Sequence, residues 1–169
     1  MKTVLRYSLY TLCASLVLMA CKKDQKTVPI QLLLTDNPAA YDSVNIHIQG
    51  IQVKMNSEES GWLTVDAKDT TVNLLDLQDG VTMVIAQDEI PDGVLKEVRF
   101  ILGDGNYVVI GSDKFPMATP SAEESGLKIK IDKDLNETLN TFTLDFDADL
   151  SVKEENGSYK LSPVIQLRS

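Results

Sequence analysis

Val44-Asn45-Ile46-His47-Ile48-Gln49-Gly50-Ile51-Gln52-Val53-Lys54-Met55 is the stretch of sequence that decides the fold. Apolar and polar side chains alternate along it, as they do on a β-strand that buries one face. The alternation changes phase at Gly50, because the apolar positions are even-numbered before it and odd-numbered after it. A strand repeats every two residues, so this change of phase predicts a β-bulge at Gly50.

The same alternation continues on both sides of this stretch, from Val28 to the C-terminus, with turn residues at short intervals. We expect about nine or ten strands, which is typical of a β-sandwich or barrel. Because most strands have one polar face, the pattern favours antiparallel sheets. Gly103-Asp104-Gly105-Asn106 and Asn156-Gly157 predict hairpin turns. The expected strand segments, besides the opening stretch, are Ile30–Leu34, Trp62–Val65, Thr71–Leu75, Val81–Ile85, Val98–Leu102, Tyr107–Ile110, Leu127–Ile131, Phe142–Phe146 and Tyr159–Leu167.

The N-terminus has the pattern of an export signal. Lys2 and Arg6 precede an apolar run that ends in Leu18-Met19-Ala20-Cys21, and this run is too short for a good membrane-spanning helix. The four residues resemble the bacterial lipobox, which implies lipidation of Cys21 on its thiol and new N-terminus and anchoring to a membrane. An ordinary secretory signal with a chance cysteine is the alternative. The predicted division is a signal peptide at 1–20, a lipidated tether at 21–27 and one domain at 28–169.

The charge balance argues against nucleic acid as a partner. The chain has 16 basic and 25 acidic residues; loss of Lys2 and Arg6 with the signal leaves 14 basic residues and a formal charge of −11. Such a domain repels nucleic acid, although the charge also simply keeps a surface domain soluble. Cys13 would be removed with the signal, so we expect a mature domain without a disulfide.

Three carboxylates suggest a metal site. Asp145, Asp147 and Asp149 occupy alternate positions, and on an extended strand they would share one face. Calcium takes six to eight oxygen ligands from such groups, and Asp36 and Asp104 could join them. The alternative is a solvated strand face, because the Gly and Asn spacing of a calcium loop is missing. A glycosidase pair made from the same carboxylates is a weaker alternative.

Two segments suggest ligand binding. The stretch from Phe115 to Gly126 is the longest irregular one, and long loops on rigid sheets often bind ligands; its polar residues Ser121, Glu123 and Ser125 are the candidates. Trp62 beside a polar turn could stack on a sugar or peptide, but packing against the protein is the alternative. Tyr107 and Tyr159 are expected to pack.

The remaining polar residues provide no sign of catalysis. His47 falls among the polar positions of its strand, so we expect it to be exposed. No cysteine or second histidine accompanies it, so we do not expect it to be a metal ligand or a catalytic base. No serine lies in a Gly-x-Ser-x-Gly turn. Gly103-Asp104-Gly105 joins two expected strands without a following helix, so it is not a phosphate loop. We therefore expect no catalytic residues and no enzymatic activity, and no cofactor apart from the calcium considered above.

Several segments, taken together and in order, resemble the domain-of-unknown-function 4382 family of bacterial, Bacteroidetes-type lipoproteins. The resemblance implies an exported antiparallel β-sandwich, prealbumin-like or immunoglobulin-like, with no established activity. Asn37 departs from the small residue that the family more often has before this proline. The segments that carry the resemblance are Leu34–Pro38 with Tyr41, Val44–Ile51, Asn73–Leu77, Arg99–Asp104, Thr119–Ala122 with Ser125–Lys128, Leu144–Ala148 and Pro163–Ile165.

These observations predict a lipid-anchored cell-envelope protein, placed at the outer membrane through Cys21. The charged tether at Lys22–Lys26 resembles the surface-export signals of Bacteroidetes lipoproteins, which favours display on the outer face. The first functional hypothesis is a non-catalytic module that binds a glycan, a matrix component or an envelope protein. The second is a structural or assembly accessory, for example of a surface fibre, that pairs through exposed strand edges. A small hydrolase is the third.

Overall fold

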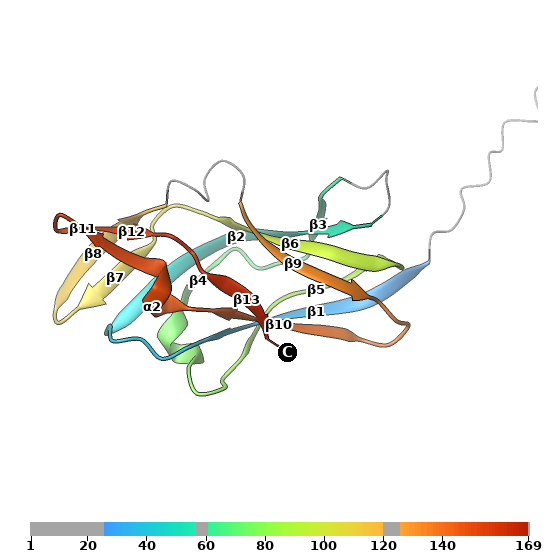
Figure 1. Ribbon diagram of the computed structural model, residues 1–169, viewed down its shortest axis with the longest axis horizontal. Helices are drawn as coiled ribbons and strands as arrows, with labels where there is room; N and C mark the ends of the chain where they lie inside the picture. Colours follow the sequence, from blue (N-terminus) through green and yellow to red (C-terminus); the bar gives the residue numbers. More distant parts are fainter. Residues whose placement is uncertain (1–25, 57–60, 120–125, 169) are drawn as a thin grey trace, which may run out of the picture.

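The computed structural model describes residues 26–56, 61–119 and 126–168. It confirms an all-β sandwich: two sheets lie in layers, with β1 in one and β2 in the other (Figure 1). The described residues form thirteen strands, more than the expected nine or ten, with the 3₁₀ helix η1 (Leu74–Leu77) and the α-helical turn α2 (Ala148–Ser151).

The smaller sheet is built around the first strand of the domain. Its order is β13 (Ile165–Arg168), β10 (Asn140–Phe146), β1 (Thr27–Asp36) and β5 (Met83–Pro91). The pair β1·β10 is parallel, with Leu34 opposite Leu144, whereas β1·β5 and β10·β13 are antiparallel. Because β1 and β10 are parallel, their C-terminal residues, Asp36 and Phe146, lie side by side at one end of the sheet.

The larger sheet is built around the long strand that the opening stretch predicted. Its order is β11 (Val152–Glu155), β12 (Ser158–Leu161), β8 (Asp113–Ala118), β7 (Tyr107–Ile110), β2 (Ser43–Met55), β6 (Val94–Leu102) and β9 (Leu127–Asp134), with β3 (Leu63–Val65) and β4 (Thr70–Asn73) also paired to β2. Both Val65 and Phe100 face Ile51, and both Asn73 and Tyr107 face Asn45. Thus β3 and β4 follow one another along one side of β2, and β6 and β7 along the other.

Gly50 is the site of a β-bulge, as predicted. The pairing of β2 with β6 shifts register between Ile48 and Gly50. The shift lets Ile48 and Ile51 both point into the core, where each is at most 1% exposed. A single long strand can therefore bury its apolar residues on one face over its whole length.

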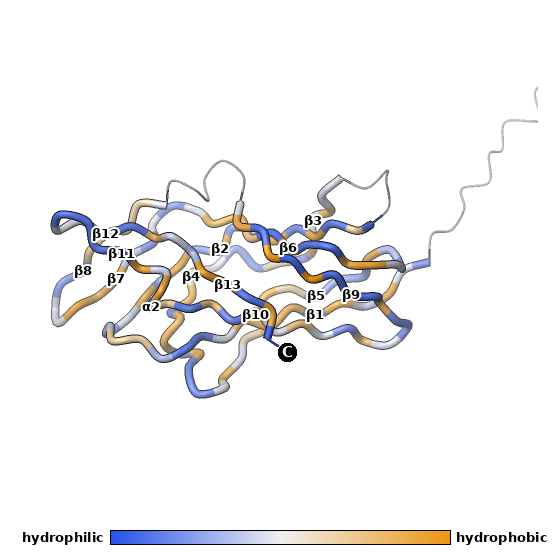
Figure 2. Tube along the Cα trace, viewed as in Figure 1, coloured by the Kyte–Doolittle hydropathy of each residue, from blue (hydrophilic) through white to orange (hydrophobic). Residues whose placement is uncertain are grey.

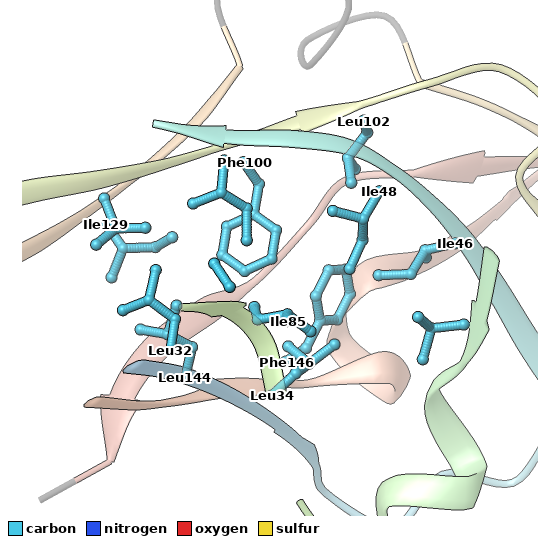
Figure 3. Packing of buried hydrophobic residues seen from close by; sticks show 14 of the residues in the cluster. Leu32, Leu34, Ile46, Ile48, Ile85, Phe100, Leu102, Ile129, Leu144 and Phe146 are labelled. Atoms are coloured by element: carbon cyan, nitrogen blue, oxygen red, sulfur yellow. The ribbon is translucent and has the colours of Figure 1, made fainter. Parts of the chain in front are cut away.

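The core lies between the two sheets (Figure 3). Leu32, Leu34, Leu144 and Phe146 come from the smaller sheet and point toward the larger one, and Phe100 points back toward them; all five are fully buried. On the outer faces the strands are polar, so hydrophilic and hydrophobic residues alternate along strands such as β9 (Figure 2). Burial of these side chains, each contributing about 1.5–3 kcal/mol, holds the layers together.

Some turns and strand ends differ from the prediction. Asn156-Gly157 does form the hairpin between β11 and β12, with both residues at positive φ. Gly103–Asn106 does not form a hairpin. β6 and β7 lie end to end along the same side of β2, and this segment connects them. The predicted last strand is two strands, β12 and β13, in different sheets, separated at Pro163.

The sequence prediction was wrong for two further segments. The expected loop from Phe115 begins as strand β8, which pairs with β7 and, in parallel, with β12. The expected strand at Thr71–Leu75 ends at Asn73, whose side chain accepts a hydrogen bond from the Leu75 N–H and so starts η1. In both cases tertiary pairing or a cap outweighed the local pattern.

Candidate functional site

Some of the predicted site residues lie outside the described residues. They are the lipidation site Cys21 and the loop residues Ser121, Glu123 and Ser125. Lipidation of Cys21, the signal at 1–20 and the tether at 21–27 stay predictions. The described part of the domain begins just before β1, at Lys26.

The predicted metal site does not have the expected geometry. Asp145 lies near the end of β10, which stops at Phe146, so the three aspartates do not share an extended strand face. Asp147 is the N-cap of α2, where its carboxylate accepts a hydrogen bond from the Leu150 N–H at 2.8 Å. Asp149 is exposed within α2. The chain leaves the strand because aspartate is among the best N-cap residues.

Asp36 lies near Asp147 at the shared end of β1 and β10. It is only 3% exposed, and one of its oxygens accepts a hydrogen bond from the Ala148 N–H at 2.9 Å. Burial raises the pKa of Asp36 to about 6, although the Ala148 N–H, the Gln78 side chain and the Asn37 N–H lower it; the Asp147 charge adds to the rise. We call Asp36, Asp145 and Asp147 the carboxylate end.

The carboxylate end contains polar atoms without partners. Oδ2 of Asp36, Oδ1 of Asp145 and Nε2 of Gln78 are buried and make no hydrogen bond of good geometry, although the Gln78 amide lies close enough to Asp36 to lower its pKa. Asp145 pairs in register with Thr35, whereas Asp36 pairs with Phe146, so Asp36 and Asp145 point to opposite faces of the sheet. Within residues 26–56, 61–119 and 126–168, no group of three or more His, Cys, Asp or Glu side chains could hold a metal ion. Asp36 and Asp147 instead accept hydrogen bonds from the first turn of α2, from the Ala148 and Leu150 N–H groups.

Trp62, the single tryptophan of the chain, is surrounded by cations. The guanidinium carbon of Arg99 lies 4.2 Å from the centre of the indole ring, and the ammonium nitrogens of Lys54 and Lys128 lie 5.9 and 6.0 Å from it. These distances are typical of cation–π contacts. The ring is half-buried, so Trp62 packs on the protein and still reaches solvent. We call Trp62, Lys54, Arg99 and Lys128 the cationic face.

The sheet register brings these cations together. Gln52 on β2 faces Thr64 on β3 and Arg99 on β6, and Arg99 in turn faces Lys128 on β9. Nε of Arg99 donates to Oε1 of Gln52 at 3.0 Å, and Nε2 of Gln52 donates to Oγ1 of Thr64 at 3.2 Å. The row therefore fixes the Arg99 side chain beside the indole ring. Lys54 lies two residues along β2 on the same outer face.

Gly126 connects the cationic face with the predicted binding segment. A Cβ at this position would lie 2.7 Å from the Phe100 carbonyl oxygen and 2.7 Å from Cγ of Arg99. The residue has φ +66°, which favours glycine. The last residue of the Phe115–Gly126 segment thus lies against the same arginine that stacks on Trp62. The structure brings together Trp62 and one end of the segment proposed for ligand binding.

His47 is more constrained than the sequence suggested. Its Nε2 lies 2.6 Å from Oδ1 of Asp69 and its Nδ1 lies 2.9 Å from the Asp104 carbonyl oxygen. The hydrogen bond to Asp69 is the main cause of a raised His47 pKa, with the Asp104 carbonyl adding to it. Both neighbours are acceptors, so the imidazolium form satisfies both at once. His47 is a cross-link between β2, the β6–β7 interruption and the segment before β4.

Tyr107 and Tyr159 pack against the protein, as expected. Tyr159 and Phe115 have ring centres 5.0 Å apart, and the ammonium of Lys114 lies 3.4 Å from the centre of the Tyr107 ring. Tyr41 is partly buried against the core. Burial, with Asp149 nearby, raises the pKa of Tyr41. None of these rings stands beside a cluster like that around Trp62.

A groove of about 240 Å³ lies along the outer edge of the smaller sheet. It is lined by residues of β5 and of the segment between β3 and β4, which meet at an isolated bridge between Ala67 and Ala86. Val84 is 47% exposed beside it.

Sequence reasoning missed most of the cationic face. It identified Trp62 but not Lys54, Arg99 or Lys128, which come from three separate strands. Each of the three is an outward-facing polar residue on an alternating strand, and such residues are common. A prediction of strand pairing and register would have been needed to find them.

The fold and the cationic face define the class of protein, a β-sandwich domain with an exposed aromatic–cation cluster. The family model for a domain of unknown function, DUF4382, matches residues 27–163, from the start of β1 to Pro163. The chain belongs to this family. No curated protein and no solved structure matches it. The described residues include no helix with the length and apolar character needed to cross a membrane.

Proposed function

We propose that this chain is a lipid-anchored protein of the cell envelope, of the Bacteroidetes lipoprotein type, whose β domain is a non-catalytic binding module. The anchor is Cys21, supported by the apolar run and the Leu18–Cys21 motif. The predicted tether is short and precedes β1, so the domain would stand close to the outer membrane.

The cationic face is the observation that supports binding. Like charges directly opposite one another on neighbouring strands are unfavourable, and Arg99 and Lys128 are such a pair. Acidic residues outnumber basic ones in this chain, so two basic residues facing each other do not simply reflect its composition. A pair of like charges opposite one another beside a half-buried ring fits a binding role.

The first test is an array of glycans and matrix proteins probed with residues 22–169, with and without calcium. A saturable hit in either condition supports the binding module. A blank array in both conditions contradicts it. A hit that needs calcium would support the predicted metal site at Asp145, Asp147 and Asp149.

The anchor has its own test, which uses the full chain in a bacterial host that processes lipoproteins. Metabolic labelling with a palmitate analogue is expected to label the wild-type chain, and the Cys21→Ser variant is expected to remain unlabelled. Equal labelling of both chains, or of neither, contradicts anchoring at Cys21.

The edge of the smaller sheet favours a second candidate function, in assembly of a surface fibre or envelope complex. β5 is an edge strand with Val84 exposed and a groove beside it, and exposed edges can accept a strand from a partner. Cross-linking in the intact envelope from a photoreactive residue at Val84 would capture such a partner. If only the array gives a hit and Val84 captures nothing, the binding module is favoured.

A further inference from the structure

We infer that the cationic face binds an anionic carbohydrate, namely a polysaccharide with carboxylate groups such as a polymer of uronic acids. The inference rests on the proposed function and names the class of ligand for the same surface. Its central elements are Trp62, Lys54 and Lys128, with Arg99 as a fixed support beside the ring.

The charges of the cationic face favour an anion. Lys54, Arg99 and Lys128 gather around one indole ring, and the ion pair that Lys54 makes with Glu97 is long at 3.9 Å. The ion pairs found among the described residues do not include Lys128, which is exposed. By contrast, Lys130 on the same strand is 2.8 Å from Asp132 and is neutralised. Among the described residues, three cations therefore lie within about 6 Å of the centre of the Trp62 ring.

The neutral groups of the surface favour a sugar. Gln52 and Thr64 place an amide and a hydroxyl beside the ring, joined to each other by a hydrogen bond. An indole offers an apolar body with a polar N–H, and sugars present apolar ring faces together with hydroxyl groups. A carboxylated polymer would match each element: carboxylates for Lys54 and Lys128, hydroxyls for Gln52 and Thr64, and a ring face for Trp62.

The rest of the domain limits the alternatives. Its overall negative charge repels stiff, densely charged double-stranded nucleic acid at a distance. At about 0.1 M salt the screening length is about 10 Å, so this repulsion fades while contacts at the cationic face remain. A flexible polysaccharide can reach the face with a short segment and leave the acidic surfaces uncovered.

The test is calorimetric titration of residues 22–169 with polygalacturonate at 0.1 M salt, with neutral dextran as the comparison polymer. We expect saturable binding of polygalacturonate and none of dextran. The double variant Lys54→Gln/Lys128→Gln is expected to bind about tenfold more weakly, as is wild type at 0.5 M salt.

The matched control is Lys153→Gln/Lys160→Gln. These two lysines also lie on strands of the larger sheet, as direct partners on β11 and β12, and their loss changes the net charge by the same amount. The control variant is expected to bind like wild type. Equal weakening by both double variants, or equal binding of polygalacturonate by wild type and Lys54→Gln/Lys128→Gln, overturns the inference.

The outcomes separate the inference from the proposed function. If the array gives a hit with a neutral glycan or a protein and polygalacturonate does not bind, the ligand class is wrong and the binding module stands. An acidic peptide that binds through Lys54 and Lys128 while polygalacturonate does not also overturns the carbohydrate assignment. If neither the array nor the titration gives binding, the proposed function itself fails.

Discussion

The carboxylate end of the smaller sheet and the cationic face of the larger sheet both gather charged side chains, but they differ in burial. Asp36 is 3% exposed, has a raised pKa and accepts a hydrogen bond from the start of α2. Lys54 and Lys128 are exposed and lie around a half-buried ring. Charges that are buried and bonded to the backbone determine stability, whereas exposed charges held in a fixed geometry are available to a ligand.

Gly126→Ala should have the largest effect on stability, because it disturbs the support of the cationic face. The new Cβ would meet the Phe100 carbonyl oxygen at 2.7 Å and would sit on a backbone with φ +66°. Strain and overpacking together should lower the free energy of unfolding by about 3 kcal/mol, measured by urea denaturation.

Gly111→Ala is the matched control for this substitution. Gly111 has nearly the same φ, +64°, with no atom within 4 Å of the new Cβ. It should lose only about 1 kcal/mol, from backbone strain alone. An equal loss in the two variants would mean that close packing at Gly126 is unimportant.

Asp36→Asn tests the carboxylate end through pH. The folded pKa of about 6 is above the ordinary value of 3.8, so the folded state binds the proton more tightly. The resulting stability is fully present below pH 3.8 and is lost as the pH rises through 6. Between pH 4 and 7 wild type should lose about 2–3 kcal/mol that Asp36→Asn does not lose.

The measurement for Asp36 is urea denaturation of both proteins at several pH values. Taking the difference between the two proteins cancels the contribution of other titrating groups. We expect Asp36→Asn to be the more stable protein at pH 7. A difference that stays constant from pH 4 to 7 would contradict the raised pKa.

Asp147→Ala and Asp149→Ala test whether two aspartates that the sequence analysis assigned to one site have different roles. Asp147 caps α2, so its loss should cost about 1 kcal/mol. Asp149 is exposed, and its loss should change stability by less than about 0.5 kcal/mol. Thermal denaturation at neutral pH measures both. Equal effects would restore the idea that these carboxylates act as one set.

Lys54→Gln/Lys128→Gln should have the smallest effect on stability. The removed contacts are exposed, and the change also relieves repulsion between Arg99 and Lys128, so the free energy of unfolding should change by less than about 0.5 kcal/mol. Thermal denaturation beside Lys153→Gln/Lys160→Gln provides the comparison. A large loss of stability would mean that the cationic face holds the fold and that the contrast with the carboxylate end is wrong.

The sequence was sufficient to predict the layers of the fold. The alternation and the change of phase at Gly50 gave both the long strand and its bulge, because burial of one face and the two-residue repeat leave few other solutions. Asn156-Gly157 gave a hairpin for the local reason that both residues tolerate positive φ. The parallel pairs β1·β10 and β8·β12 had no local signal, since they join segments far apart in the chain.

The candidate site was less predictable than the fold. Asp147 continues the alternation of the preceding strand, but aspartate is also a good N-cap residue. Because β10 ends at Phe146, Asp147 is the N-cap of α2. Lys54, Arg99 and Lys128 become neighbours only through the pairing of β2, β6 and β9. Register therefore creates the cationic face, and a single sequence does not specify register between distant strands.

Quenching of Trp62 fluorescence tests the central claim most directly, because this residue is the only tryptophan in the chain. Iodide and caesium ions report the local potential at the indole ring. With the quenching by each ion normalised to that of N-acetyltryptophanamide, we predict that iodide quenches residues 22–169 more strongly than caesium does, despite the negative net charge of the chain. The difference should shrink in 0.5 M salt and in Lys54→Gln/Lys128→Gln. Equal quenching by the two ions, or stronger quenching by caesium, would contradict a cationic face at Trp62.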